Sequence, residues 1–252
     1  MIDQERLHTT IFAKQTTEDS KSMALRLQAA QKAGEQLKSS EREEYIHQVA
    51  DSFLEIQDAV DCLDMAEVFL KSYSVSKSWK DRYDQHHYFR YHYESWVLNA
   101  IKVYERILIL VNSVYWLEIP HKEITFLTVS QHPKLQNTKT LLLLNKVHGA
   151  LSQLQALKNT VFHRYAYTDD DLRTIKIFSM LARHGKDKER VQFANIAKVQ
   201  MRSIYLPEKR KEIESNNKQI LKIVDSIFNA LELPYIERRD ALDSTLQLKQ
   251  KT

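Results

Sequence analysis

The sequence is poor in the residues that build turns and cross-links. Its 252 residues include three glycines, four prolines and one cysteine, Cys62. So few glycines and prolines leave little turn chemistry for a sheet protein, whereas the abundant Leu, Lys, Gln, Glu and Ala favour helices. A lone cysteine excludes an internal disulfide and any zinc site built from several cysteines. We therefore expect an all-α protein in a reducing compartment.

Long hydrophobic runs are also lacking. The most apolar window, "ILILVNSVYWLEI", is too short and too polar to span a bilayer. The opening "MIDQERLHTT" has early acids and no apolar stretch of the kind that a secretory signal needs. We therefore expect a cytoplasmic protein with no membrane partner.

The net charge of +4 identifies no partner, but its distribution is uneven. Residues 183–211 hold nine Lys or Arg against three acids, which gives a local balance of +6. A solvated helix face is the simpler interpretation of this basic segment, and a surface that faces a polyanion is the alternative.

Apolar residues recur at steps of three and four, which predicts long amphipathic helices. Helices are expected over about 40–73, over about 79–117 and from about 138, with a weaker one over 17–37. Ser40 with Glu43 predicts a capping box at the start of the helix over 40–73. The third should bury Leu143, Val147, Ala150, Leu154, Leu157 and Val161. "TDDDL" starts a fourth helix, capped by Thr168 or Asp169 and stopped at Gly185.

Two more helices follow, split before Pro207, and the last dozen residues resemble a frayed end. Such stripes pack as an antiparallel bundle, with the helices of residues 42–117 and 138–182 at its centre. We expect an N-terminal helical extension over 1–40, a bundle core over 41–185, and a C-terminal helical pair and tail over 186–252. Glu67 takes an apolar position of its stripe, so we expect it to pair with a cation inside the bundle.

The stretch "RYDQHHYFRYHYESW" mixes three histidines with aromatic residues. Packing is the favoured role of the aromatics on the core stripe. His87, Arg90 and His92 are candidates to line a cleft, where RNA bases would stack on neighbouring rings. No acid and no cysteine stand at the spacing of a zinc site, so we predict no metal.

A second polar cluster ends the third helix: "LKNTVFHRYAY", residues 157–167. Here a cation, Lys158, stands five residues before His163. Chance alone gives roughly 1.5 such pairs in a chain of this composition, so spacing by itself does not select a site. The sequence holds three: Arg42 with His47, Arg82 with His87, and Lys158 with His163.

The surroundings of the third pair distinguish it. The helix "LLLLNKVHGALSQLQALKNTVFHRY", preceded by "YHYESWVLNAIKVYERILILVNSVYWL" and followed by an acid-capped helix, resembles the HEPN superfamily of helical-bundle proteins. The resemblance covers roughly residues 83–182. The family motif is an Arg, usually beside a polar residue, and a His four to six residues later. Asn159 and His163 match this motif, and Lys158 replaces the Arg.

The resemblance implies a metal-independent endoribonuclease of the toxin or defence type, needing no cofactor. His163 would transfer a proton while the 2′-hydroxyl of RNA attacks the adjacent phosphate, Lys158 would stabilise phosphate charge, and Asn159 would orient the groups. Lys lacks the two-pronged donor set of Arg, so activity could be reduced. Tyr165 matches a tyrosine that a nucleotidyltransferase-type antitoxin modifies in some family toxins.

Helix geometry constrains this site. Residues five apart differ by about 140° around an α-helix, so Lys158 and His163 point to different sides. Either the helix unwinds before His163, or two copies pool their groups in a homodimer, as is the habit of the family.

Two other interpretations remain open. One is a non-catalytic HEPN-like bundle that binds nucleotide, RNA or a partner protein, and the other is a structural dimerisation domain. In either case His163 would simply cap a helix C-terminus, and Lys158 would be a solvated residue on the helix face.

Overall fold

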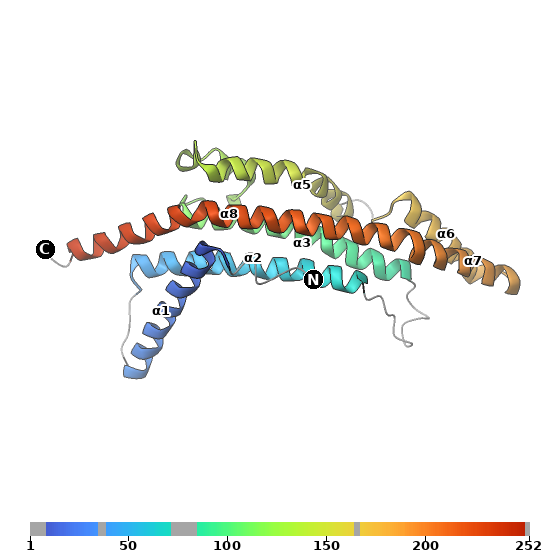
Figure 1. Ribbon diagram of the computed structural model, residues 1–252, viewed down its shortest axis with the longest axis horizontal. Coiled ribbons are helices and arrows are strands. Elements are labelled where there is room, and N and C mark those ends of the chain that lie inside the picture. Colours follow the sequence, from blue (N-terminus) through green and yellow to red (C-terminus); the bar gives the residue numbers. More distant parts are fainter. Residues whose placement is uncertain (1–8, 35–38, 72–84, 164–166, 250–252) are drawn as a thin grey trace. The chain divides into compact units, whose positions relative to one another are not determined.

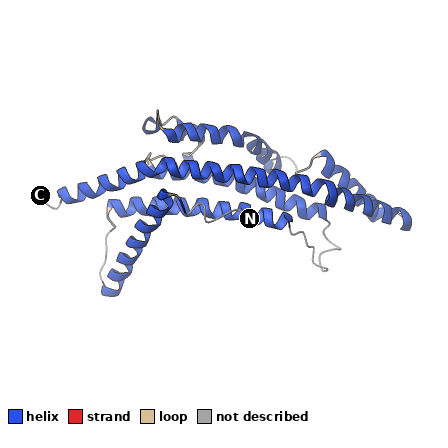
Figure 2. Ribbon diagram, in the orientation of Figure 1, coloured by secondary structure: helices blue, strands red, loops and turns tan. Residues whose placement is uncertain are grey.

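The computed structural model describes residues 9–34, 39–71, 85–163 and 167–249, without the side chains of residues 85, 152–153, 160–163 and 244–249. Every element in these ranges is helical, which confirms the all-α prediction (Figures 1 and 2). The order is α1 (Ile11–Ala33), α2 (Glu41–Lys71), α3 (Gln85–Val114), η2 (His121–Glu123), α4 (Phe126–Ser130), η3 (Pro133–Leu135), α5 (Lys139–His163), α6 (Asp170–His184), α7 (Asp187–Val199), η4 (Gln200–Tyr205) and α8 (Leu206–Lys249).

Local side-chain chemistry sets several of these boundaries. Before α2, Ser40 and Glu43 form the predicted capping box, in which the Ser40 N–H donates to the Glu43 carboxylate at 2.9 Å. Asp169 caps α6 by accepting the Leu172 N–H at 2.8 Å, and Gly185 ends that helix. A Cβ on Gly185 would lie 2.9 Å from a backbone oxygen, so the turn needs glycine for space.

The split expected before Pro207 is a single widened turn. η4 is π-helical, and α8 begins directly after it. Pro207 has no N–H, and its ring would clash with the carbonyl four residues earlier, so an ordinary α-turn is unfavourable there. α8 then continues to Lys249, beyond the point at which the sequence suggested fraying.

The described residues form two compact units. One, here called the motif unit, comprises residues 61–101 and 153–219; the other, the terminal unit, comprises residues 3–60, 102–152 and 220–252. α2, α3, α5 and α8 each contribute residues to both. α8, which the sequence placed outside the central bundle, therefore supplies core residues to each unit. The domain division at residues 40 and 185 stays a prediction.

Aromatic packing forms the centre of the terminal unit. Phe12 of α1 is fully buried against Phe53, Phe228 and Tyr235, with ring centroids 5.5 to 6.1 Å apart. This contact explains why α1 begins at Ile11, about six residues earlier than its weak apolar pattern suggested. Isolated helices are marginal, and packing supplies most of their stability.

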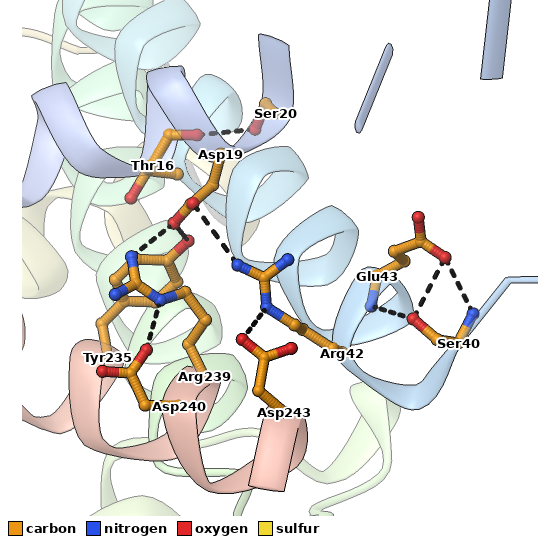
Figure 3. A network of polar contacts seen from close by, with 10 residues as sticks. All are labelled: Thr16, Asp19, Ser20, Ser40, Arg42, Glu43, Tyr235, Arg239, Asp240 and Asp243. Carbon is orange, nitrogen blue, oxygen red and sulfur yellow. Dashed lines mark hydrogen bonds and ion pairs between the residues drawn. The ribbon is translucent and has the colours of Figure 1, made fainter. Parts of the chain in front are cut away.

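A polar network ties the same unit together at Asp19 (Figure 3). Its carboxylate accepts the Tyr235 hydroxyl at 2.7 Å and Arg239 at 2.9 Å, while Arg42 lies 3.8 Å away. Arg42 also pairs with Asp243 at 3.0 Å. These contacts join α1, α2 and α8 through charge-assisted hydrogen bonds, which are stronger than neutral ones.

A buried polar chain crosses the motif unit. The Trp96 indole N–H donates to Asn217 at 2.8 Å, and the Asn217 amide donates to Glu67 at 2.8 Å. Glu67, only 4% exposed, also pairs with Lys71 of the next helical turn. Glu67 therefore meets a cation as expected, but Lys71 is exposed, so this cation lies at the surface and not inside the bundle. The chain fixes α2, α3 and α8 in one register, because each buried polar group needs its partner.

Candidate functional site

The motif lies on α5, whose start and buried face follow from its sequence. The Thr138 hydroxyl accepts the Leu141 N–H at 3.2 Å and caps the helix. Burial differs from the predicted stripe at four positions, because Leu143, Leu154 and Leu157 are only half-buried and Ala150 is exposed. Val147 is buried as predicted, and Thr140, Leu144 and Leu151 are buried as well. Residues 141–144 are all leucine, so apolar spacing alone does not select the inward face.

The final turns of α5 belong to the motif unit and carry the candidate site. Lys158 is half-buried and Asn159 is exposed. The backbone of His163 is the last helical residue, but its side chain lies outside the described set, and Tyr165 lies outside the described residues altogether. The structure thus places one candidate cation and one amide, both accessible, on the last described stretch of the helix.

The helix is unbroken through His163. Of the two arrangements that would bring Lys158 and His163 together, unwinding before His163 is therefore not observed. On an intact helix the two residues differ by about 140°, whereas Asn159 and His163, four apart, share a side. Within one chain, Asn159 is thus the motif residue on the same side as His163.

Beyond the motif, the chain is anchored to α3. The backbone N–H of Tyr167 donates to the Glu94 carboxylate at 2.7 Å, and the Tyr167 ring lies 4.3 Å from the ring of Tyr93. Arg90, a predicted cleft residue, is 3.8 Å from Glu94. Only three residues separate His163 from this anchor, so the end of α5 is held close to the polar groups of α3.

Asp169 is the centre of the polar cluster that follows. Besides capping α6, its second carboxylate oxygen accepts the hydroxyls of Tyr167 at 2.8 Å and Tyr205 at 2.9 Å. The Lys209 ammonium lies 3.5 Å from the same oxygen, and it sits over the rings of Tyr167 and Tyr205, 5.9 Å from each centroid. We call Tyr167, Asp169, Tyr205 and Lys209 the tyrosine–aspartate cluster.

Burial and hydrogen bonding fix the charges in this cluster. Burial alone would raise the pKa of Asp169, but the N–H of Leu172, the two tyrosine hydroxyls and Lys209 together hold that pKa below its usual value. Burial is also the largest cause that raises the pKa of Tyr167 and of Tyr205. Both hydroxyls therefore stay protonated and donate to an ionised carboxylate.

Only part of this cluster is predictable from the sequence. "TDDDL" predicts a helix cap at Thr168 or Asp169, and the structure has Asp169 in that place, but the motif does not indicate the tyrosine and lysine partners of Asp169. Tyr205 and Lys209 stand 36 and 40 positions later in the chain, and they meet Asp169 only because the end of η4 and the start of α8 pack beside the start of α6. A clue was present in Tyr205 itself, because a buried tyrosine hydroxyl usually finds a partner.

His87 and His92, in the aromatic stretch of α3, have different surroundings. His92 is half-buried and stacks with Phe69 at 5.0 Å and Tyr88 at 4.3 Å. Burial lowers the pKa of His92, so its ring is neutral near pH 7 and suits stacking better than phosphate binding. His87 is half-buried beside the ring of His86 at 4.7 Å. Of the three predicted cleft residues, Arg90 is thus the one that lies near Glu94, which anchors the chain after the motif.

Two searches of the described ranges concern metals and membranes. No group of three His, Cys, Asp or Glu side chains there is arranged to hold a metal ion. No helix in those ranges combines the length and the apolar character that crossing a bilayer requires.

Comparison with known proteins gives one match. The family described as Cthe2314-like HEPN matches residues 35–232, which is 198 of the 252 residues. No curated protein and no solved structure matches the chain. The family match spans α2 to the middle of α8 and includes all the motif residues. The chain therefore belongs to the HEPN superfamily, in the Cthe2314-like HEPN family.

Proposed function

We propose that this HEPN protein is a metal-independent endoribonuclease that works as a homodimer. The observation that carries the proposal is the motif itself: Lys158, Asn159 and His163 end an unbroken helix in a chain of this family. Lys158 and His163 point about 140° apart around one intact helix. A second copy of the chain is therefore needed to bring both side chains to one phosphate. In a two-fold dimer each patch meets its own equivalent, so both copies of each group gather at the axis.

The reaction needs no group beyond the RNA and these side chains. The 2′-oxygen attacks the adjacent phosphorus and loses its proton, while the bond from phosphorus to the 5′-oxygen breaks. The products are a 2′,3′-cyclic phosphate and a 5′-hydroxyl end, and the proton released at the 2′-oxygen balances the one gained by the leaving oxygen. Each of the two sites of the dimer combines the His163 of one copy with the Lys158 of the other. That His163 takes the proton from the 2′-oxygen and delivers it to the leaving 5′-oxygen, a role that suits imidazole because its ordinary pKa is about 6.5.

The other motif residues have supporting roles in this proposal. Lys158 neutralises charge that builds on the non-bridging phosphate oxygens. Asn159 shares a side with His163 and orients either the imidazole or the phosphate. Tyr165 is proposed as the site that a nucleotidyltransferase-type antitoxin would modify, two residues after the proton-transfer group.

The second candidate function is a non-catalytic bundle that binds RNA, nucleotide or a partner protein. The residue that favours it is Lys158, because an ammonium is a point charge and does not grip phosphate with two parallel donors as Arg does. Cleavage assays separate the two functions.

The first test measures cleavage of a labelled RNA in excess chelator. We expect the wild type to cleave, His163→Ala to lose about a hundredfold or more, and Lys158→Arg to gain activity. Matched controls are Lys146→Ala on an exposed position of α5 and His121→Ala, also exposed; both should cleave as the wild type does. A pure wild-type protein that leaves the RNA intact refutes the enzyme and favours the binding module.

The second test addresses the shared site. Lys158→Ala and His163→Ala are each expected to be inactive, but mixing them with subunit exchange creates heterodimers with one intact pair of groups. Random exchange should then restore about a quarter of the wild-type rate. A mixture as inactive as its components, with exchange verified by mass, would show that the two groups do not act across an interface.

A further inference from the structure

α6 and α7 form a helical hairpin in the motif unit, packed side by side and joined by the tight turn at Gly185 (Figure 1). A cavity of about 200 Å³ marks the inner side of this hairpin, where it faces the buried His86 of α3. Three alanines line the cavity: Ala182 of α6, and Ala194 and Ala197 of α7. The hairpin therefore turns small side chains toward the rest of the motif unit.

Large apolar side chains lie on the opposite side of both helices. Residues two apart on an α-helix differ by about 200°, so they point in nearly opposite directions. On α6, Ile175 is buried and Ile177 is 47% exposed; on α7, Ala197 is buried and Val199 is 56% exposed. The exposed large apolar side chains of the two helices are Ile177, Met180, Val191 and Val199.

This arrangement reverses the one that folding favours. A hairpin shaped only by its own packing would bury the large apolar side chains and expose the small ones. Here the alanines leave a hollow inside, and four large side chains of two neighbouring helices stand in water. Exposed apolar side chains that cluster in this way mark interaction surfaces, whereas single ones need no explanation.

The same hairpin is strongly basic. Residues 173–199 contain seven Lys or Arg against two acids, Asp187 and Glu189, which gives a local balance of +5. All seven cations are exposed: Arg173, Lys176, Arg183, Lys186, Lys188, Arg190 and Lys198. Arg173 lies 3.4 Å from Asp170, but an ion pair at the surface is weak and leaves the potential of the hairpin positive. We call the four exposed apolar side chains and the seven cations the outer hairpin surface.

The side-chain types on this surface distinguish among anionic partners. RNA-binding surfaces use exposed aromatic rings on which bases stack, and none of the four exposed apolar side chains is aromatic. The aromatic residues Phe178 and Phe193 are half-buried and pack against each other, with ring centroids 6.1 Å apart. In a two-fold dimer through this surface, seven cations would face the same seven, and they would repel one another.

We propose that the outer hairpin surface binds an anionic lipid membrane. Phospholipids of net negative charge combine phosphate groups with hydrocarbon, so they contact the cations and the apolar side chains at once. The cations lie among the headgroups, and Ile177, Met180, Val191 and Val199 enter the boundary between headgroups and acyl chains. The contact is peripheral. The expectation of no membrane partner rested on spanning segments and a secretory signal, and neither bears on a peripheral contact. The inference is independent of the ribonuclease proposal, since no motif residue takes part.

Flotation of the full chain with vesicles tests the contact. One set of vesicles is phosphatidylcholine alone, and the other mixes phosphatidylcholine with an equal amount of phosphatidylglycerol. We expect the chain to bind the anionic vesicles at least about tenfold more tightly than the neutral ones. That binding should weaken as the salt concentration rises from about 0.1 M to about 0.5 M, because salt screens the cations. No binding to anionic vesicles at millimolar lipid, or equal binding to both sets, overturns the proposal.

Charge variants locate the electrostatic part of the contact. Lys186→Gln with Lys188→Gln removes two cations beside the turn and should weaken binding to anionic vesicles about tenfold. The matched control is Lys139→Gln with Lys146→Gln, which removes two exposed cations of α5 and should bind as the wild type does. An equal loss in the control would mean that net charge alone acts, and it would refute the surface. Loss of RNA affinity in the hairpin variant, when the wild type binds no vesicle, would assign the surface to RNA instead.

Apolar variants then test insertion. Ile177→Ser with Val199→Ser removes apolar area without changing the charge, and it should weaken binding about tenfold, because affinity follows the apolar area that enters the membrane. The matched control is Leu54→Ser with Leu142→Ser, two exposed leucines outside the hairpin, which should bind as the wild type does. Unchanged binding by the hairpin variant would refute insertion. A smaller oligomer in that variant, measured by light scattering without lipid, would assign the surface to self-association and refute the membrane contact.

Discussion

Replacing Asp169 tests the tyrosine–aspartate cluster that anchors the chain after the motif. Asp169→Ala removes the cap of α6 and the acceptor of two tyrosine hydroxyls. Asp169→Asn keeps one oxygen, which suffices to cap the helix because Asn is as good a cap as Asp. It loses the charge that faces Lys209. The two variants therefore separate the cap from the charged acceptor.

The magnitudes follow from the contacts. A lost cap costs about 1 kcal/mol, and each hydroxyl that donates to a charged group contributes about 1.5 to 3 kcal/mol. The Asp169 side chain is 31% exposed, so the lower end of that range applies. We expect Asp169→Ala to lower the free energy of unfolding by about 4 kcal/mol and Asp169→Asn by about half as much.

Urea unfolding followed by circular dichroism measures both changes, and amide exchange of Leu172 reports the cap directly. The pH dependence gives a further check. The pKa of Asp169 is lower in the folded protein than in the unfolded chain. Its stabilisation is therefore fully present above the unfolded pKa of about 3.9 and is lost as the pH falls through the folded pKa. The gap between wild type and Asp169→Asn should shrink in that acidic window.

Two results would refute this reasoning. If Asp169→Asn is as stable as the wild type, the charge of the carboxylate has no role. If the gap between wild type and Asp169→Asn stays constant in acid, the carboxylate is not held ionised by its neighbours. The control is Asp171→Asn, which changes an exposed acid in the first turn of the same helix.

Two further substitutions test other parts of the motif unit. Asn217→Leu leaves the Trp96 N–H and one Glu67 oxygen buried without their partner, so we expect a loss of about 3 kcal/mol in urea unfolding; a loss below about 1 kcal/mol would contradict the buried chain. Gly185→Ala places a Cβ 2.9 Å from the Leu181 carbonyl oxygen and should cost about 1 to 3 kcal/mol, seen as a lower Tm. An unchanged Tm would mean that the turn relaxes freely.

Sequence patterns predicted the features that depend on local chemistry. The capping box at Ser40, the cap at Asp169 and the stop at Gly185 each need only a few neighbouring residues, and all three occur. Glu67 was identified as paired because a carboxylate in an apolar stripe needs a cation, and Lys71 lies one turn away.

Features that depend on contacts distant in sequence could not be predicted in the same way. The predicted inward face of α5 was wrong at Ala150, which is exposed, and Leu143, Leu154 and Leu157 are only half-buried. The four consecutive leucines at residues 141–144 suit either face. The distant partners of Asp169 come from η4 (Tyr205) and α8 (Lys209), and the sequence placed both segments outside the central bundle. The cavity depends on alanines of two helices that face each other, and small residues give no periodic signal of empty space.

The candidate site was predictable only through its motif. Lys158 and Asn159 lie on the helix as expected, and the same spacing implied that one unbroken helix cannot bring both Lys158 and His163 to one phosphate. The hydrogen bond from the Tyr167 backbone N–H to Glu94 could not be predicted. Every residue except proline carries a backbone N–H, so the sequence does not mark which of them donates.

Cys62 is exposed on α2, and its thiol is the only one in the chain. A nitroxide attached to it adds one spin per polypeptide at a surface position, without any engineered residue. A dipolar coupling between spins can then arise only from a neighbouring molecule. Pulsed electron resonance on the unaltered sequence thus reports self-association directly, with a distance that docking of two copies must reproduce.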